Sequence, residues 1–268
     1  MFAIFQYSFI QNAFIAGSLV AIVAGFVGYF LVTRGLTFAG HALSHIGFAG
    51  AAGALVFGVS PILGLLVFTI VAAMGIGVFG KDLREEDINI GVVMTLMLGL
   101  GALFLSLYNG YAEQAYSILF GTILGISRTD VWLTAIFGLA TIVVLAAIFR
   151  PLLFSSIDPE VAEARGVPVR FLGILFLVLV AVAVSISVQV VGVLLIFTLL
   201  IGPAATATRL AHGPFHAVLL SMGLGLAYVW LAIFLAATGP WPVSFYIAAI
   251  SFVVYLPVRL LSPQWAKR

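Results

Sequence analysis

Long apolar stretches separated by short polar intervals dominate this sequence. No Asp, Glu, Lys or Arg occurs from Ile88 to Ala112, from Phe171 to Thr208 or from Leu210 to Val258. Each stretch is longer than the roughly 20 residues that a helix needs to cross a hydrocarbon core. The second and third are long enough for two crossings, and turn residues divide them at Ser185–Gly192 and Thr238–Pro242. The pattern therefore predicts helical hairpins in a bilayer.

Apolar runs bounded by charged or turn residues predict about nine crossings, eight at the least. They cover residues 10–33, 40–59, 61–80, 89–108, 130–150, 171–189, 191–209, 215–238 and 242–260. The run from Gln114 to Ile126 is apolar but too short to span, so we expect a re-entrant half-helix there. The expected fold class is an all-α, polytopic integral membrane protein with a single transmembrane domain over residues 1–268.

Composition supports a membrane protein and excludes several classes of site. Hydrophobic residues make up 64% of the chain and charged residues only 7%, whereas about a quarter of a soluble domain is charged. A formal net charge of +2 gives no reason to expect nucleic-acid binding. The absence of cysteine excludes disulfides, thiolate metal sites and cysteine nucleophiles. Because Met1–Phe9 lacks a basic segment and a small-residue cleavage site, we expect no signal peptide.

The basic residues at the ends of the expected crossings are unevenly distributed between the two sides. Cytoplasmic loops collect Lys and Arg. With the N-terminus outside, only Arg128 falls on the outer side. The basic residues on the cytoplasmic side are then Arg34, Lys81, Arg84, Arg150, Arg165, Arg170, Arg209, Arg259, Lys267 and Arg268. The distribution predicts an outer N-terminus, a cytoplasmic C-terminus and an odd number of crossings.

Two histidines, His41 and His45, lie at the start of the second expected crossing. Residues four apart share one face of a helix, so one metal ion could contact both imidazoles. Ionisable side chains within a span usually face a cavity, a partner or an ion path. Zinc usually takes four ligands, which a two-fold symmetric dimer would supply. The alternative is a pair of histidines that only pack.

The polar interval within residues 155–168 predicts a short helix outside the membrane. Its signals are Asp158 as the N-cap, Pro159 at the first position, Glu160 in the first turn, Arg165 in the last turn and Gly166 at the end. Such a helix could dock a cytoplasmic partner or could be a solvated linker.

Two further groups of residues are weaker candidates. Gly202 and Pro203 lie within an expected crossing, where proline bends a helix; the bend is either structural or part of a gate or hinge. Thr206 and Thr208 could bond to the carbonyls that the proline frees. Candidate contacts at the outer face, either with one another or with an external partner, are Glu113, Arg128 and Asp130.

Several segments, in this order, resemble the membrane permeases of ABC importers for zinc, manganese and iron. They are His41-Ala-Leu-Ser-His45 with its Gly/Ala run, Glu86-Asp87-Ile-Asn-Ile-Gly91, Leu119-Phe-Gly-Thr-Ile-Leu-Gly125, Asp158-Pro-Glu160 through Gly166, and Val191-Gly-Val-Leu-Leu through Gly202-Pro-Ala-Ala205. The resemblance implies a homodimeric, multi-pass permease of the bacterial inner (plasma) membrane that is not itself an enzyme and holds no permanent cofactor. It also implies two cytoplasmic ATPase subunits and an extracytoplasmic metal-binding protein as partners, and a coupling helix at residues 155–168 that meets the ATPase.

The family pattern places an Asp where this chain has His41. An imidazole in place of a carboxylate should shift the preference from manganese toward zinc. Manganese and iron remain the alternatives within the family. Two rivals belong to other classes: a passive metal channel, and an intramembrane metalloenzyme. The latter lacks the general base of an H-E-x-x-H helix, because position 42 is Ala.

Overall fold

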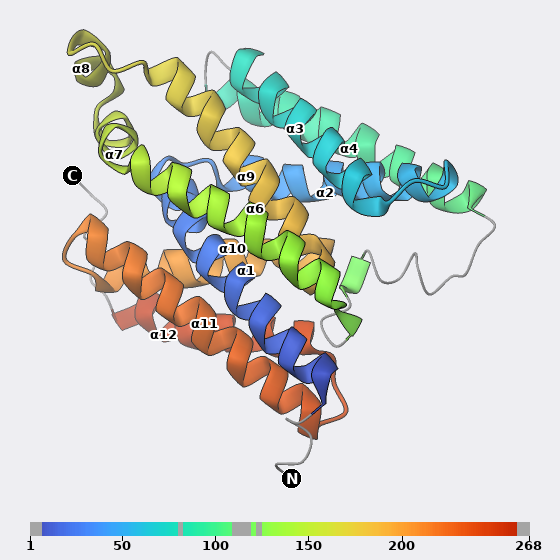
Figure 1. The fold of residues 1–268 in the computed structure, drawn as a ribbon. Coiled ribbons are helices and arrows are strands. Elements are labelled where there is room, and N and C mark those ends of the chain that lie inside the picture. Colours follow the sequence, from blue (N-terminus) through green and yellow to red (C-terminus); the bar gives the residue numbers. More distant parts are fainter. Residues whose placement is uncertain (1–6, 80–82, 109–118, 122–124, 262–268) are drawn as a thin grey trace.

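The chain folds into a bundle of helices (Figure 1). The computed structural model describes residues 7–79, 83–108, 119–121 and 125–261, and those residues contain no β-strand. The long helices are α1 (Ser8–Thr33), α2 (Thr37–Val56), α3 (Pro61–Phe79), α4 (Leu83–Leu107), α6 (Arg128–Ala147), α9 (Val169–Val191), α10 (Val193–Leu210), α11 (Pro214–Thr238) and α12 (Val243–Leu261). Two short helices, α7 (Phe149–Ile157) and α8 (Pro159–Ala164), connect α6 to α9. The all-α prediction is confirmed.

Seven helices of the described chain are long and apolar enough to cross a membrane, namely α1, α3, α4, α6, α9, α11 and α12. The other two long helices fall short of that standard. α2 carries the two histidines among small residues, and α10 qualifies only as a shorter apolar helix over Leu195–Leu210. A multi-pass membrane protein is therefore confirmed, while the count of nine crossings and the orientation stay predictions.

Both long charge-free stretches divide where the turn signals predict. α9 ends at Val191 and α10 begins at Val193, because Gly192 adopts φ +87°, a left-handed conformation that glycine accepts without strain. α11 ends at Thr238 and α12 begins at Val243. The two predicted helical hairpins are confirmed, with boundaries moved by a few residues.

The fifth expected crossing, residues 130–150, ends earlier than predicted. α6 stops at Ala147, Ile148 caps it, and α7 starts at Phe149. Pro151 has no N–H to donate to the carbonyl of Ala147, so a continuous helix would lose that bond. Proline is accepted in the first turn of a new helix, and the chain therefore breaks there.

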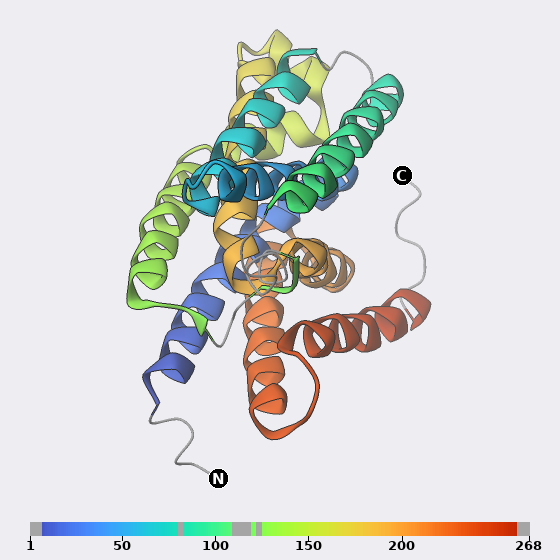
Figure 2. The same ribbon diagram turned by 90° about the vertical axis from the view of Figure 1, so that its right-hand side faces the viewer.

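α1 and α2 occupy the interior of the bundle. α1 packs against α6, α9, α10 and α11, and α2 lies between α3 and α4. Figure 2 shows α3 and α4 on one side of the bundle and α11 and α12 on the other. Glycines allow the closest approaches: a Cβ on Gly50 would strike the backbone carbonyl of Gly64, and the reverse also holds. Small residues thus set the contact between α2 and α3.

Most of the expected re-entrant segment, Gln114 to Ile126, lies outside the described residues. Its described part packs on the junction of α9 and α10. Gly121, with φ +75°, meets the backbone of Val191 and Gly192, and Ser244 Oγ of α12 donates to the carbonyl of Phe120 at 3.1 Å. The prediction of a half-helix stays untested.

Candidate functional site

The two histidines lie side by side in the second and third turns of α2. The helix starts after a tight turn in which Gly35 has φ +71°, and the N–H of Gly40 donates to the carbonyl of Leu36. His41 and His45 have ring centroids 4.6 Å apart and nearly perpendicular planes, at 88°. The expected shared helical face is confirmed as geometry.

The pair faces α10. The ring of Phe197, on α10, lies 4.8 Å from the His41 ring at an angle of 65°. Both imidazoles are partly buried, and Ala42, Leu43 and Ser44 between them are fully buried. Nδ1 of His41 is buried and has no hydrogen-bond partner. A buried polar nitrogen without a partner is uncommon, and a lone pair on such a nitrogen is available to a metal ion.

One chain supplies an incomplete donor set. Among the residues that the structure describes, no three or more His, Cys, Asp or Glu side chains lie close enough together to hold a metal ion. Two imidazoles alone fall short of the four ligands usual for zinc. Further donors would have to come from another copy of the chain, another protein or water.

The short helix α8 has the capping pattern that its sequence predicts. The Asp158 side chain accepts a hydrogen bond of 3.0 Å from the backbone N–H of Val161, and Pro159 occupies the first turn. Arg165 was expected in the last turn but lies just after it, as the C-cap residue that follows Ala164, and Gly166 ends the helix with φ +82°. The predicted short helix is confirmed; its binding role is not tested by this geometry.

Arg34 connects two segments that are distant in the sequence. From the sequence alone it is only one of the basic residues on the expected cytoplasmic side. Its Nη1 donates to Ser155 Oγ and to Ser156 Oγ, each at 3.1 Å, and its guanidinium lies 5.9 Å from the centroid of the Phe176 ring. Burial lowers the pKa of this guanidinium. The contact ties the turn before α2 to the end of α7. The only sequence signal is an arginine between two spans and two adjacent serines before Asp158.

Gly202 and Pro203 lie within α10, as predicted. A Cβ on Gly202 would strike Ser251 Oγ of α12, so this glycine permits close packing. The prediction that Thr206 and Thr208 bond to a carbonyl freed by the proline was wrong. Thr206 Oγ1 donates to the carbonyl of Gly202, and Thr208 Oγ1 donates to that of Ala205. The carbonyl freed by Pro203 belongs to Leu199, one turn back, which neither hydroxyl reaches.

The outer-face candidates do not form one cluster in the described chain. Asp130 and Ser127 form a capping box at the start of α6, with Asp130 N to Ser127 Oγ at 3.2 Å and Ser127 N to Asp130 Oδ2 at 3.1 Å. Arg128 is the first residue of that helix. Glu113 lies outside the described residues. Asp130 therefore has a structural role that the sequence prediction did not consider.

Comparisons with known proteins agree on one family. The profile of the ABC 3 transport family matches residues 6–262. The manganese import system permease protein ScaB of Streptococcus parasanguinis is 33% identical over 263 residues, covering 98% of this chain and 94% of ScaB. The manganese transport system membrane protein MntC of Halalkalibacterium halodurans is 34% identical over 208 residues, covering 77% of this chain and 71% of MntC.

A solved structure gives the same result. A chain of PsaBC from Streptococcus pneumoniae, solved in complex with Fab, matches with a TM-score of 0.87 and 31% identity, covering 98% of this chain and 97% of that chain. This protein is accordingly a multi-pass bacterial membrane protein and a permease subunit; it is not itself an enzyme, and ATP hydrolysis belongs to a separate subunit. The chain belongs to the ABC 3 transport family.

Proposed function

We propose that this chain is the membrane permease of an ABC importer that carries a divalent metal ion into the cell. The observation that carries the proposal is the histidine pair in the interior helix α2, with ring centroids 4.6 Å apart. Ionisable groups inside a span mark substrate and ion pathways more often than packing positions. The relatives ScaB and MntC are themselves named as manganese import and transport proteins.

The expected substrate is zinc, with manganese as the second candidate. The names of the relatives favour manganese and give no support to zinc. The ligands favour zinc, because two imidazoles suit a borderline metal better than manganese, which prefers carboxylate and carbonyl oxygens. His41 occupies the position where the family pattern has an Asp, and its ring touches its partner His45 directly. The donor chemistry is therefore our reason for ranking zinc first.

We expect a homodimer to complete the site. A two-fold axis beside the partly exposed side of His41 and His45 would bring the same two histidines from a second copy, giving four imidazoles around one ion. Four is the number that zinc usually takes. Binding must also be weak enough for release, because a conducting path requires both entry and exit.

The expected topology has nine crossings and an outer N-terminus. The nine crossings would be the seven clear spans together with α2 and α10. These two helices have enough residues to cross but carry polar or bent segments. The beginning of α1 and the end of α12 lie at opposite ends of the bundle in Figure 1, as an odd number of crossings requires. With this topology α8 lies on the cytoplasmic side, where basic residues gather.

Residues 155–168 are the proposed coupling segment within a single permease domain of residues 1–268. Asp158, Pro159, Glu160, Arg165 and Gly166 would present α8 to a cytoplasmic ATPase. A displacement of α8 would reach α2 through the bonds from Arg34 to Ser155 and Ser156.

Pro203 and Gly202 would let α10 bend during alternating access. α10 contacts His41 through the ring of Phe197. An extracytoplasmic binding protein would deliver the ion to the outer face.

The decisive experiment removes both histidines from the reconstituted complex. We expect His41→Ala with His45→Ala to abolish ATP-dependent uptake of zinc and manganese into proteoliposomes that contain the ATPase and the binding protein. The matched control is His212→Ala with His216→Ala, a second pair at the same spacing whose side chains are exposed. Undiminished uptake in the first variant would remove the histidine site. Uptake without ATP or a separate ATPase would instead indicate a passive channel.

A single substitution tests the choice of metal. His41→Asp restores the hard oxygen ligand of the family pattern, so we expect the ratio of zinc to manganese uptake to fall by about ten-fold, roughly 1.4 kcal/mol of selectivity. Competition between the two ions in the same vesicles measures that ratio. An unchanged ratio would contradict the assignment of zinc.

A further inference from the structure

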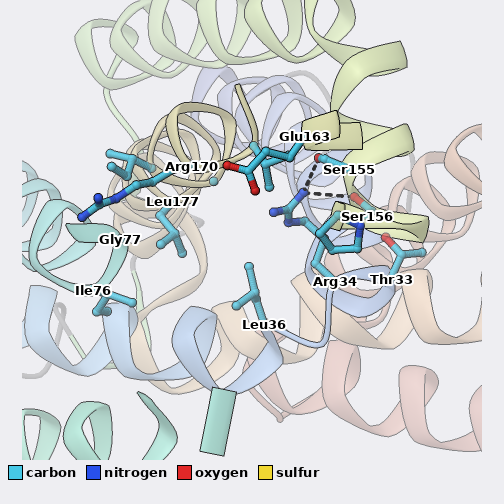
Figure 3. Close-up of a pocket in the computed structure, with 14 residues that line it drawn as sticks. Thr33, Arg34, Leu36, Ile76, Gly77, Ser155, Ser156, Glu163, Arg170 and Leu177 are labelled. Carbon is cyan, nitrogen blue, oxygen red and sulfur yellow. Dashed lines mark hydrogen bonds between the residues drawn. The ribbon is translucent and has the colours of Figure 1, made fainter. Parts of the chain in front are cut away.

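A cavity of about 630 Å³ lies behind α8, away from the histidine pair. It is bounded by the α1–α2 turn and by α3, α7, α8 and α9. Figure 3 shows Glu163, Ser155, Ser156 and Arg34 around one part of it, and Leu36, Ile76 and Leu177 around another. The lining is therefore amphipathic.

Arg34, one of the two arginines that line this cavity, lacks a counter-charge. Arg34 donates from Nη1 to two serine hydroxyls, whose own protons go to the carbonyl of Leu152, at 2.9 Å from Ser155 and 2.6 Å from Ser156. Within the described residues Arg34 forms no ion pair, and its Nε is buried without a hydrogen-bond partner. A largely buried cation is costly unless an anion accompanies it.

The two other charged groups of the cavity differ in direction. Arg170 Nη2 donates to the carbonyl of Val78 at 3.0 Å, and Figure 3 shows its guanidinium pointing away from the open centre. The Glu163 carboxylate points into the open space across from Arg34. Of the two arginines and one glutamate that line the cavity, only Arg34 and Glu163 face its open centre, from different walls, and they do not bond to each other.

We infer that this cavity binds the headgroup of a zwitterionic membrane phospholipid, with its phosphate on Arg34 and its primary ammonium toward Glu163. Arginine binds phosphate through several N–H donors, and basic pockets between transmembrane helices recognise lipid headgroups. The apolar wall of Leu36, Ile76 and Leu177 suits the glycerol and upper acyl carbons, which a free phosphate ion lacks. The bound lipid belongs to the leaflet that meets the α7–α8 end of the bundle.

Two variants and one control test the location of the site. Arg34→Gln removes the positive charge. Gly173→Leu keeps Arg34 and fills part of the cavity with a side chain. There is space for that side chain to start, because a Cβ on Gly173 would meet only Arg34 Nη2, at 3.8 Å. Arg170→Gln removes the same charge from the same cavity while leaving Arg34 in place. Phospholipid retained by the purified permease complex is measured by native mass spectrometry, and thermal unfolding shows that each variant folds.

We expect Arg34→Gln and Gly173→Leu to retain phosphatidylethanolamine at least about ten-fold more weakly than the wild type and Arg170→Gln. Equal retention in all four proteins would overturn the inference. An equal loss in Arg170→Gln and Arg34→Gln would also overturn it, because general surface charge would then explain the lipid.

The lipid class is tested with vesicles of phosphatidylcholine to which phosphatidylethanolamine or phosphatidylglycerol is added. Preferential retention of phosphatidylethanolamine, reduced in Glu163→Gln, supports the zwitterionic assignment. Equal retention of phosphatidylglycerol would overturn it. Inorganic phosphate that stabilises delipidated protein as strongly as the lipid does would assign the site to a free ion instead. None of these readouts depends on which metal is transported, so failure here leaves the proposed function standing.

Discussion

α2 and α4 are neighbours of similar length that pack against each other, yet they have opposite environments. α2 is rich in small residues and carries two histidines, and Ala42 and Ala51 on it are 0% exposed. α4 carries large apolar residues, and Val92 and Leu96 on it are 66% and 60% exposed. In a soluble protein large apolar side chains such as these would be buried. Lipid removes that driving force, so close packing and polar contacts decide which helix lies inside.

The substitution with the largest expected effect disrupts the packing of α2 on α3. Gly50→Leu places a side chain against the backbone carbonyl of Gly64, so helices must separate. We expect the free energy of unfolding to fall by about 3 kcal/mol or more, seen as loss of monodisperse protein or a lower melting temperature in detergent. The control is Gly75→Leu on α3, where a Cβ would meet nothing within 4 Å. Wild-type stability in Gly50→Leu would mean that α2 is not held by close contact.

A substitution with an intermediate expected effect tests the side of α2 that faces α10. Phe197→Ala removes the ring that lies against His41, which should leave the imidazole free to rotate. We expect the KM for metal uptake to rise by about ten-fold, as when a group that orients a metal ligand is lost, with little change in melting temperature. Phe252→Ala, at a position of α12 that is 63% exposed, serves as the control and should not alter uptake. An unchanged KM would separate Phe197 from the metal path.

The smallest effect concerns the outer face of α4. Leu96→Ala exchanges one exposed apolar side chain for a smaller one, and we expect the free energy of unfolding to change by less than about 0.5 kcal/mol. Thermal denaturation in lipid nanodiscs measures the change. A markedly larger loss would indicate that another protein chain, and not lipid, covers this face of α4.

Local signals made much of the fold predictable. The helical hairpin at Gly192, the cap at Asp158 and the end at Gly166 each follow from the chemistry of one or two residues, and the structure places them as expected. The early end of α6 before Pro151 was also readable but was missed, because the apolar run continues across the break. The shared face of His41 and His45 needed only helical spacing.

Other features could not be read locally because they join residues far apart in the chain. The bonds from Arg34 to Ser155 and Ser156 bridge more than a hundred residues, and nothing in either segment indicates the other. The capping role of Asp130 depends only on Ser127, three residues before it, and could have been predicted. It was missed because Asp130 was interpreted as a contact at the outer face.

The sequence by itself determined that this chain crosses a membrane many times through helices, because a backbone in hydrocarbon must satisfy its own hydrogen bonds and long uncharged runs leave no other solution. It also placed two imidazoles on one helical face. Only the tertiary structure decided that this face meets Phe197 and that Arg34 lies beside an amphipathic cavity. The physical reason is that apolarity tells a helix to enter the bilayer, whereas its neighbours are chosen by close-range packing and polar contacts between distant segments.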